Sequence, residues 1–431
     1  MKRPLLALSI FSATLLAQSY DLLLKGGHVM DPKNNVNGVM DVAITGSKIE
    51  RVAANIPASA AKKVIDVGGL YVMPGLVDMH VHVYASTGQR GAYSGDLSLY
   101  PDGYTLRSGV TTAVDLGSSG WRNFPDFKDR VMDRARTRIF AMLNIVGHGM
   151  GGGAIEQNTQ DMDSEATAKV AKQYPGVIVG VKTAHFLAAE WIAVDNAVAA
   201  GKLADIPVVV DFGTPWPERS YVKLVTEHLR PGDMSTHMYS SASQPLVDSS
   251  GKVVPALVAA RKRGVKFDVG HGGGSFVWYL AAPAVKAGWT PDSISTDLHV
   301  GSMNAGMKDM PTTMSKILNL GVPLYEVIRM STINPATQIR RPEYGHLSVG
   351  AGADVAVLRL DQGQFGFQDA RGARLTGKQK LTCELTLRAG QVVWDLNGRA
   401  GEDWEKLYSD PERRRPRTPQ RGTSGPKTSG R

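Results

Sequence analysis

The hydrophobic pattern of the central region alternates between short apolar runs and longer stretches of helical composition. The runs are rich in Val, Ile and Ala, as buried parallel strands are, and stretches such as 164–174 and 253–263 separate them. The apolar runs lie at 76–83, 110–116, 139–146, 177–182, 207–212, 234–237, 265–270 and 293–297. Eight strand–helix units in succession favour an α/β fold with a closed (β/α)8 barrel over an open sheet.

Both ends of the chain have a different pattern, in which short β-rich runs end in turn residues. Runs of this kind lie at 22–27, 41–46, 64–69, 354–358 and 385–393. We predict that segments 18–70 and 346–400 together form a small β-sandwich domain beside the barrel at 71–345. Residues 401–431 are rich in Pro, Arg, Ser and Gly, which predicts a basic disordered tail.

The first 17 residues have the pattern of a secretory signal peptide. Lys2 and Arg3 supply the charged start, residues 5–16 are apolar, and Ala17 is a plausible cleavage position. The apolar run is too short to span a bilayer. We therefore expect a periplasmic or secreted protein without a membrane span, the alternative being an ordinary N-terminal helix.

The formal net charge of +9 is unevenly distributed. The stretch 411–431 contributes +6, and Lys2 with Arg3 contributes +2, so the remaining chain is close to neutral. This distribution gives no reason to expect nucleic-acid binding, and we expect a small-molecule substrate, with a homo-oligomer left open. Cys383 is the single cysteine, which excludes an intramolecular disulfide, so stability must come from the core and any bound metal.

His80 and His82 stand two residues apart near the end of the first predicted barrel strand. Their side chains should point to the same side of the strand, and imidazole is a common metal ligand. Further polar residues end other predicted strands: Lys182, Asp211, His237, His271 and Asp297. Barrel active sites lie at this rim, and buried charges there would be costly without a cation to pair them. The pattern therefore favours a metal site over two histidines that only satisfy core hydrogen bonds.

Several segments together resemble the amidohydrolase superfamily. These segments are 72–82, which ends in the His-x-His pair, 109–115, 180–182, 236–237 and 295–299. The glycine-rich stretch 268–276 is similar to the dihydroorotase-related amidohydrolase/deacetylase group within that superfamily. The resemblance covers roughly residues 20–400, and it implies a metal-dependent hydrolase built on a barrel.

The resemblance also implies a site for two divalent metal ions, zinc or manganese. His80, His82 and Asp297 would hold the more buried ion, and His237 would bind the second. Lys182 would bridge both ions as a carbamate formed with CO2, because a free ammonium group only donates and cannot ligate a metal.

Asp211 is the point at which the chain departs from the family's pattern, which has a histidine at the end of the fifth strand. A carboxylate can still ligate a metal. With the carbamate, Asp211, Asp297 and a hydroxide, however, two divalent ions would be fully neutralised. We therefore predict a weaker Lewis acid and a preference for harder metals such as Mn²⁺, the alternative being a site that has lost its second metal.

Three further residues are candidate substrate contacts: His271, Tyr239 and His185. Relatives carry an arginine shortly after the bridging lysine, whereas residues 183–185 read Thr-Ala-His, so an anionic substrate group would be recognised differently here. The alternative for His271 is hydrogen bonding within its own glycine-rich loop. The glycine-rich stretch 147–153 resembles a flexible lid more than a phosphate-binding loop, because no Gly-Lys-Ser/Thr follows it.

The resulting hypothesis is a hydrolase of the deacetylase or amidohydrolase type, acting on an amide, ester or cyclic amide bond. A metal-activated water would attack the carbonyl, and Asp297 would carry the proton to the leaving group. One alternative is a dihydroorotase-like or aminoacylase-like enzyme acting on a C–N bond. Another is a catalytically inactive metal-binding barrel, which would have no need of a general base such as Asp297.

Overall fold

The first seven predicted barrel strands form one curled parallel sheet in the computed structural model, which describes residues 19–85 and 97–414. In sheet order and along the chain the strands are β6 (Leu76–Val81), β7 (Val110–Gly120), β8 (Arg138–Asn144), β9 (Ile178–Thr183), β10 (Val208–Val210), β11 (Met234–Ser235) and β12 (Lys266–Phe267). Every residue of β6, β7 and β9 is buried, as expected for parallel strands that are covered on both faces.

The eighth predicted run does not form a regular strand. Instead, single bridges join Ser293 to Asp268, beside β12, and Leu298 to Val81 at the end of β6. The backbone N–H of His82 also donates to the carbonyl of Leu298 at 2.8 Å. This segment therefore contacts both edges of the seven-stranded sheet, and it brings the residues around 297 beside the end of β6.

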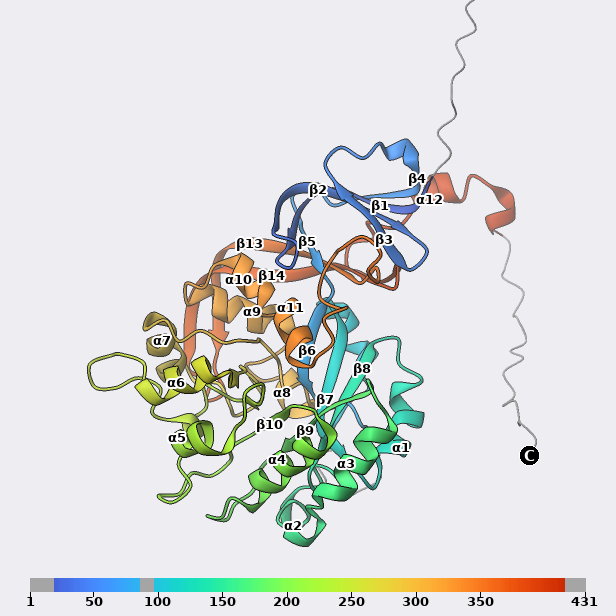
Figure 1. The fold of residues 1–431 in the computed structure, drawn as a ribbon. Helices are drawn as coiled ribbons and strands as arrows, with labels where there is room; N and C mark the ends of the chain where they lie inside the picture. Colours follow the sequence, from blue (N-terminus) through green and yellow to red (C-terminus); the bar gives the residue numbers. More distant parts are fainter. Residues whose placement is uncertain (1–18, 86–96, 415–431) are drawn as a thin grey trace, which may run out of the picture.

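Helices follow most of the strands, and their ends have clear causes in the sequence. Their bounds are α1 (Phe124–Phe127), α2 (Gly153–Glu156), α3 (Ser164–Gln173), α4 (Ile192–Ala204), α5 (Tyr221–Lys223), α6 (Pro255–Arg263), α7 (Trp278–Lys286), α8 (Val300–Met303), α9 (Met310–Asn319), α10 (Leu324–Arg329) and α11 (Ile333–Gln338). The Asp163 carboxylate accepts from two backbone N–H groups and caps α3, and Gly264, at φ 112°, ends α6. Figure 1 shows α3 and α4 on the outside of the sheet, where both pack against β9.

Both ends of the chain meet in a second, eight-stranded sheet, drawn in blue and orange in Figure 1. Its strands are β1 (Tyr20–Asp31), β2 (Val36–Thr45), β3 (Lys48–Ala53), β4 (Ala61–Asp66), β5 (Tyr71–Pro74), β13 (Val355–Gln368), β14 (Arg374–Arg388) and β15 (Gln391–Asp395). β1 pairs with β4 over its first half and with β5 over its second half, past an irregularity between Leu24 and Gly27. The two-layered sandwich that we predicted is not confirmed. Because β5 belongs to this sheet, the sheet extends to Pro74.

The predicted signal peptide, residues 1–17, lies outside the described residues. The predicted disordered tail is partly described, and residues 401–414 contain a short helix, α12 (Trp404–Leu407), followed by a 3-10 turn at Pro411–Arg414. The Asp403 carboxylate accepts from two backbone N–H groups and caps α12, a local device that composition alone does not reveal. Across residues 19–85 and 97–414, the helices are too short or too polar to cross a membrane.

Candidate metal centre

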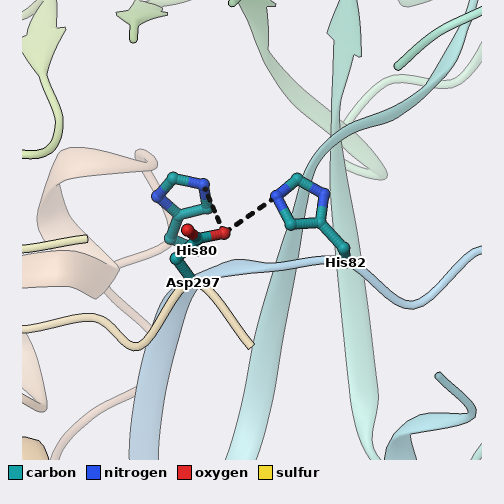
Figure 2. Close-up of side chains that lie close together, drawn as sticks. All are labelled: His80, His82 and Asp297. Carbon is teal, nitrogen blue, oxygen red and sulfur yellow. Dashed lines mark ion pairs between the residues drawn. The ribbon is translucent and has the colours of Figure 1, made fainter. Parts of the chain in front are cut away.

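The Asp297 carboxylate lies between the two histidines of the His-x-His pair (Figure 2). Its Oδ1 atom is 3.4 Å from His80 Nε2 and 3.1 Å from His82 Nε2. All three side chains are buried, and their ligand atoms lie within 4.8 Å of one another. The fold thus brings together residues more than 200 positions apart, as predicted from the strand pattern. We call this group the first cluster.

The orientation of His80 is fixed by a hydroxyl group and a second buried carboxylate. The Thr236 hydroxyl donates to Asp268 Oδ2 at 2.8 Å and lies 3.0 Å from His80 Nδ1. A hydroxyl has a single hydrogen, so Thr236 must accept the Nδ1 proton of His80. His80 Nε2 therefore presents its lone pair to Asp297. Burial, followed by the nearby charge of Lys182, lowers the pKa of His80 well below its usual value and keeps this ring neutral.

His82 is oriented by an equivalent arrangement. The Ser118 hydroxyl lies 2.9 Å from His82 Nδ1 and also hydrogen-bonds to the buried Asp115 carboxylate. Asp115 is held in place by the backbone N–H groups of Val83 and Ser118, each at 2.8 Å. Since the Ser118 hydrogen goes to the carboxylate, His82 donates from Nδ1 and turns its Nε2 atom toward Asp297.

Asp297 is the anion of the first cluster. Burial would raise the pKa of its carboxyl group, but a hydrogen bond from His82 and nearby positive charge hold that pKa well below its usual value. Its second oxygen, Oδ2, lies 4.0 Å from His299 Nε2. A side chain at Gly272 would place a Cβ only 2.2 Å from this oxygen, so a glycine is needed there. Asp297 therefore remains ionised, with one oxygen directed at the two imidazoles.

A second group of side chains, which we call the second cluster, is centred on Asp211 after β10. Its Oδ2 atom is 3.2 Å from His185 Nε2 and 3.5 Å from His237 Nε2. His237 Nδ1 donates to the Gly270 carbonyl at 2.6 Å, and His185 Nδ1 donates to the Glu156 carboxylate at 2.8 Å. Burial would raise the pKa of Asp211, but His237 and His185 keep it well below its usual value.

Lys182 at the end of β9 lies next to the first cluster. Its Nζ is 3.5 Å from His80 Nε2, and among the described residues no carboxylate lies within ion-pair distance of it. Burial lowers the pKa of Lys182, although Asp211 and Asp297 act in the opposite direction. A Cβ at Gly117 would lie 2.8 Å from Lys182 Cγ, so the side chain is closely confined. The lowered pKa makes the neutral amine, which is the form that can react with CO2, more accessible than it is in an exposed lysine.

The donor set of the two clusters suits divalent cations. Four imidazoles turn an Nε2 atom toward an oxygen of Asp297 or Asp211, with each Nδ1 already used for a hydrogen bond. In the first cluster, the Nε2 lone pair of the neutral His80 ring faces a carboxylate, which is unfavourable unless a positive charge lies between them. In the second cluster, burial would lower the pKa of His185, but Asp211 and Glu156 raise it to about 10, so this ring can itself carry the positive charge when no cation is bound. Nitrogen and oxygen donors in this arrangement are typical ligands of zinc and related metals.

Two of the predicted substrate contacts lie apart from these clusters. His271 is fully buried, and its Nε2 lies 2.5 Å from Lys316 Nζ while Nδ1 lies 2.9 Å from the Gly272 carbonyl oxygen. Tyr239 is also fully buried, and its hydroxyl donates to the Trp289 carbonyl. Both side chains are thus occupied by structural hydrogen bonds. His185 is different, since the structure brings it to Asp211.

Several residues of the centre were missed at the sequence level: Ser118, Thr236, Asp115, Asp268, Glu156 and His299. Asp115 and Asp268 lie in segments that carry the family resemblance, and Thr236 directly precedes His237. The position of these three residues at or near the ends of strands could have indicated their part in the site. Glu156 had no such signal, because it lies on α2 beyond the glycine-rich stretch.

Comparison with known proteins identifies relatives of this chain. An amidohydrolase family model matches residues 275–394. A protein named deacetylase from Agrobacterium fabrum is 32% identical over 340 residues, which cover 77% of this chain and 81% of the relative. A solved adenine deaminase has a TM-score of 0.78 and 27% identity, and the match covers 87% of this chain and 100% of the deaminase chain. A solved dihydroorotase has a TM-score of 0.75 and 30% identity, and the match covers 87% of this chain and 97% of the dihydroorotase chain. The chain therefore belongs to the amidohydrolase superfamily and resembles its dihydroorotase-related deacetylase group.

Proposed function

We propose that this protein is a metal-dependent hydrolase that cleaves an amide, ester or cyclic amide bond of a small molecule. One observation carries the proposal. Four oriented imidazoles face two ionised carboxylates beside a buried lysine, at the rim where the parallel strands end. Structural hydrogen bonding alone has no need of the first cluster, because it holds the neutral His80 ring with its Nε2 lone pair toward the ionised Asp297.

The proposed metal sites follow from the clusters. His80, His82 and Asp297 would hold one divalent ion, Asp211 and His237 would hold a second, and Lys182 would bridge them as a carbamate. Bound there, such cations would supply Lewis acidity, which ionises water near neutral pH and polarises a carbonyl group. Zinc and manganese are the candidates.

Asp297 would be the proton carrier of the reaction. It is ionised, so it can take a proton from the attacking water and deliver it to the leaving nitrogen or oxygen. His299 is placed to hold it in position. Its Nδ1 accepts from the Gly301 N–H at 3.0 Å, so the ring carries its proton on Nε2, directed toward Asp297 Oδ2.

The relatives suggest the kind of bond. The deacetylase of Agrobacterium fabrum supports removal of an acetyl group from a small molecule as the leading activity. The solved dihydroorotase, at 30% identity, supports opening of a cyclic amide as the second candidate. In either case, a substrate role for His271 and Tyr239 stays a prediction that their observed contacts do not favour.

Three further expectations remain part of the proposal. The segment around 293–298 would serve as the eighth barrel strand, supported by its bridges to both edges of the sheet. The pattern of residues 1–17 supports export to the periplasm or the exterior. A homo-oligomer and a role for the basic tail stay open to experiment.

The test is hydrolysis of a panel of N-acetyl and O-acetyl compounds and cyclic amides by protein loaded with zinc or manganese. We expect wild-type turnover on at least one class. Asp297→Asn keeps a side-chain oxygen that can ligate a metal, so with metal in excess it should retain the ions but lose turnover by about 10³-fold, the scale of a lost general base. No turnover by metal-loaded wild type on the whole panel would contradict the proposal and favour the inactive metal-binding barrel.

A further inference from the structure

The second cluster repeats the arrangement of the first cluster. In the first, two imidazole Nε2 atoms lie 3.4 and 3.1 Å from one oxygen of Asp297. In the second, two imidazole Nε2 atoms lie 3.5 and 3.2 Å from one oxygen of Asp211. His185 therefore takes the same position toward Asp211 that a candidate metal ligand takes toward Asp297.

His185 is held in this orientation by a buried carboxylate. Glu156, at the end of α2, is 2% exposed, and its Oε2 accepts from His185 Nδ1 at 2.8 Å. Its other oxygen accepts from the Gly152 N–H at 3.0 Å. A carboxylate bound to the far nitrogen of an imidazole fixes the tautomer and raises the basicity of the near nitrogen, as it does behind many metal-bound histidines.

The backbone of His185 is also held. Gln157 donates from its side-chain amide to the His185 carbonyl at 2.9 Å. His185 has a φ of 56°, in the left-handed region, and His237 and Asp297 share this conformation at 59° and 51°. Such conformations are costly outside glycine and collect at functional sites. Six other non-glycine residues of the described chain, all outside the clusters, also have a positive φ, so this conformation accompanies the contacts of His185 and does not by itself mark a ligand.

From this geometry we propose that His185 is a ligand of the second metal ion, together with Asp211 and His237, and that Glu156 orients it. The inference rests on the proposed function, since it requires the metal centre. It changes the role that the sequence suggested, because His185 becomes part of the metal site and its contact with substrate becomes indirect.

A consequence concerns the choice of metal. With Asp211 and a single histidine, the second site would be rich in oxygen ligands and favour harder cations such as Mn²⁺. A second imidazole restores a nitrogen-rich donor set, which suits zinc and cobalt. The second cluster should then bind Zn²⁺ or Co²⁺ in preference to Mn²⁺, and loss of His185 should reverse that preference.

The experiment measures metal content and affinity of the full chain, with visible absorption of the cobalt form as a second readout. The variants are His185→Ala and Glu156→Gln. His228→Ala is the matched control, because His228 is another imidazole bound to a carboxylate, 2.7 Å from Asp195, outside both clusters. Circular dichroism confirms that each variant is folded.

We expect two zinc ions per wild-type chain and per control chain. In His185→Ala the second ion should bind at least about 100-fold more weakly while the first is retained, and Glu156→Gln should weaken the second ion by about 10- to 100-fold. The cobalt spectrum should lose the contribution of one ion in His185→Ala. Unchanged affinity for two ions in folded His185→Ala would overturn this inference alone, whereas fewer than two ions in wild type would overturn the dinuclear centre itself.

Discussion

The two clusters contain similar residues but differ in exposure and in how their histidines are oriented. His80 and His82 are each 1% exposed, whereas the side chain of His185 is 45% exposed. In the first cluster, a hydroxyl group separates each imidazole from its buried carboxylate. In the second cluster, His185 contacts Glu156 directly, and His237 contacts a backbone carbonyl.

This difference indicates different tasks. An enclosed cluster with two hydroxyl-linked supports suits an ion that is retained and that organises the centre. A cluster that is open to solvent on the side of His185 suits an ion that exchanges and that faces the substrate. The direct contact of Glu156 with His185 compensates for this exposure, because it strengthens His185 as a metal ligand.

The largest expected effect is loss of the enclosed cluster. His80→Ala removes a ligand and leaves the buried Asp297 without one of the three imidazoles around it. Turnover should fall by at least about 10³-fold, and the first ion should be lost from protein dialysed against buffer. Metal analysis and hydrolysis assays would check this, with His28→Ala as the control, since that ring contacts Asn37 and Tyr71 far from the clusters. Wild-type turnover with only the open cluster occupied would reverse the assignment of tasks.

Lys182→Ala tests whether Lys182 bridges the two metal ions or is only a buried side chain beside them. If Lys182 carries a carbamate that bridges the clusters, its removal should lower turnover by about 10²- to 10³-fold through weakened binding of the second ion. Added acetate or propionate should partly restore activity, because a small carboxylate can occupy the vacated space. A variant with full activity, or one that no carboxylate rescues while both ions stay bound, argues against the carbamate.

Thr236→Val tests the hydroxyl-linked support of the first cluster. The substitution keeps the shape but leaves His80 Nδ1 and Asp268 without their shared partner. Affinity for the first ion should fall by about 10-fold, while the second ion is little affected. Thr226→Val is the control, since that hydroxyl donates only to the Val222 carbonyl. Equal weakening of both ions would show that the two clusters are not independently supported.

The smallest expected effect concerns Lys316. Its Nζ lies 2.5 Å from Nε2 of His271, in the glycine-rich stretch 268–276 next to the first cluster. Burial lowers the pKa of Lys316 to about 7, although Asp369 acts in the opposite direction. In the unfolded chain the pKa is about 10.4, so between about pH 7 and 10 the unfolded state binds more protons and stability rises with pH. Urea unfolding at pH 7 and pH 9 should show this rise in wild type and a smaller rise in Lys316→Met. Identical pH dependence in the two proteins would remove Lys316 as the cause.

The sequence predicted the parts of the fold that depend on periodicity. Seven of the eight apolar runs became strands of the parallel sheet, and the spacing of His80 and His82 placed both rings on one side. Asp297 was predicted from its position at the end of the last apolar run. The sandwich was not confirmed, because turn-rich runs do not specify whether strands pair in one sheet or stack in two.

The rest of the site depends on contacts that spacing cannot give. Thr236 and Ser118 are common residue types, and only the fold shows that each links an imidazole to a buried carboxylate. Tyr239 and His271 follow strands as predicted, yet both turn into the core. The direction of His185 depends on its left-handed backbone and on Glu156, 29 positions away.

Anomalous X-ray scattering from crystals of the zinc-loaded protein tests most directly that the clusters bind two cations. Data collected on both sides of the zinc edge should give two peaks about 3.5–4 Å apart, one against His80, His82 and Asp297 and the other against Asp211 and His237. Absence of zinc from the position between Asp297 and the His-x-His pair, in protein loaded with excess zinc, would contradict the account.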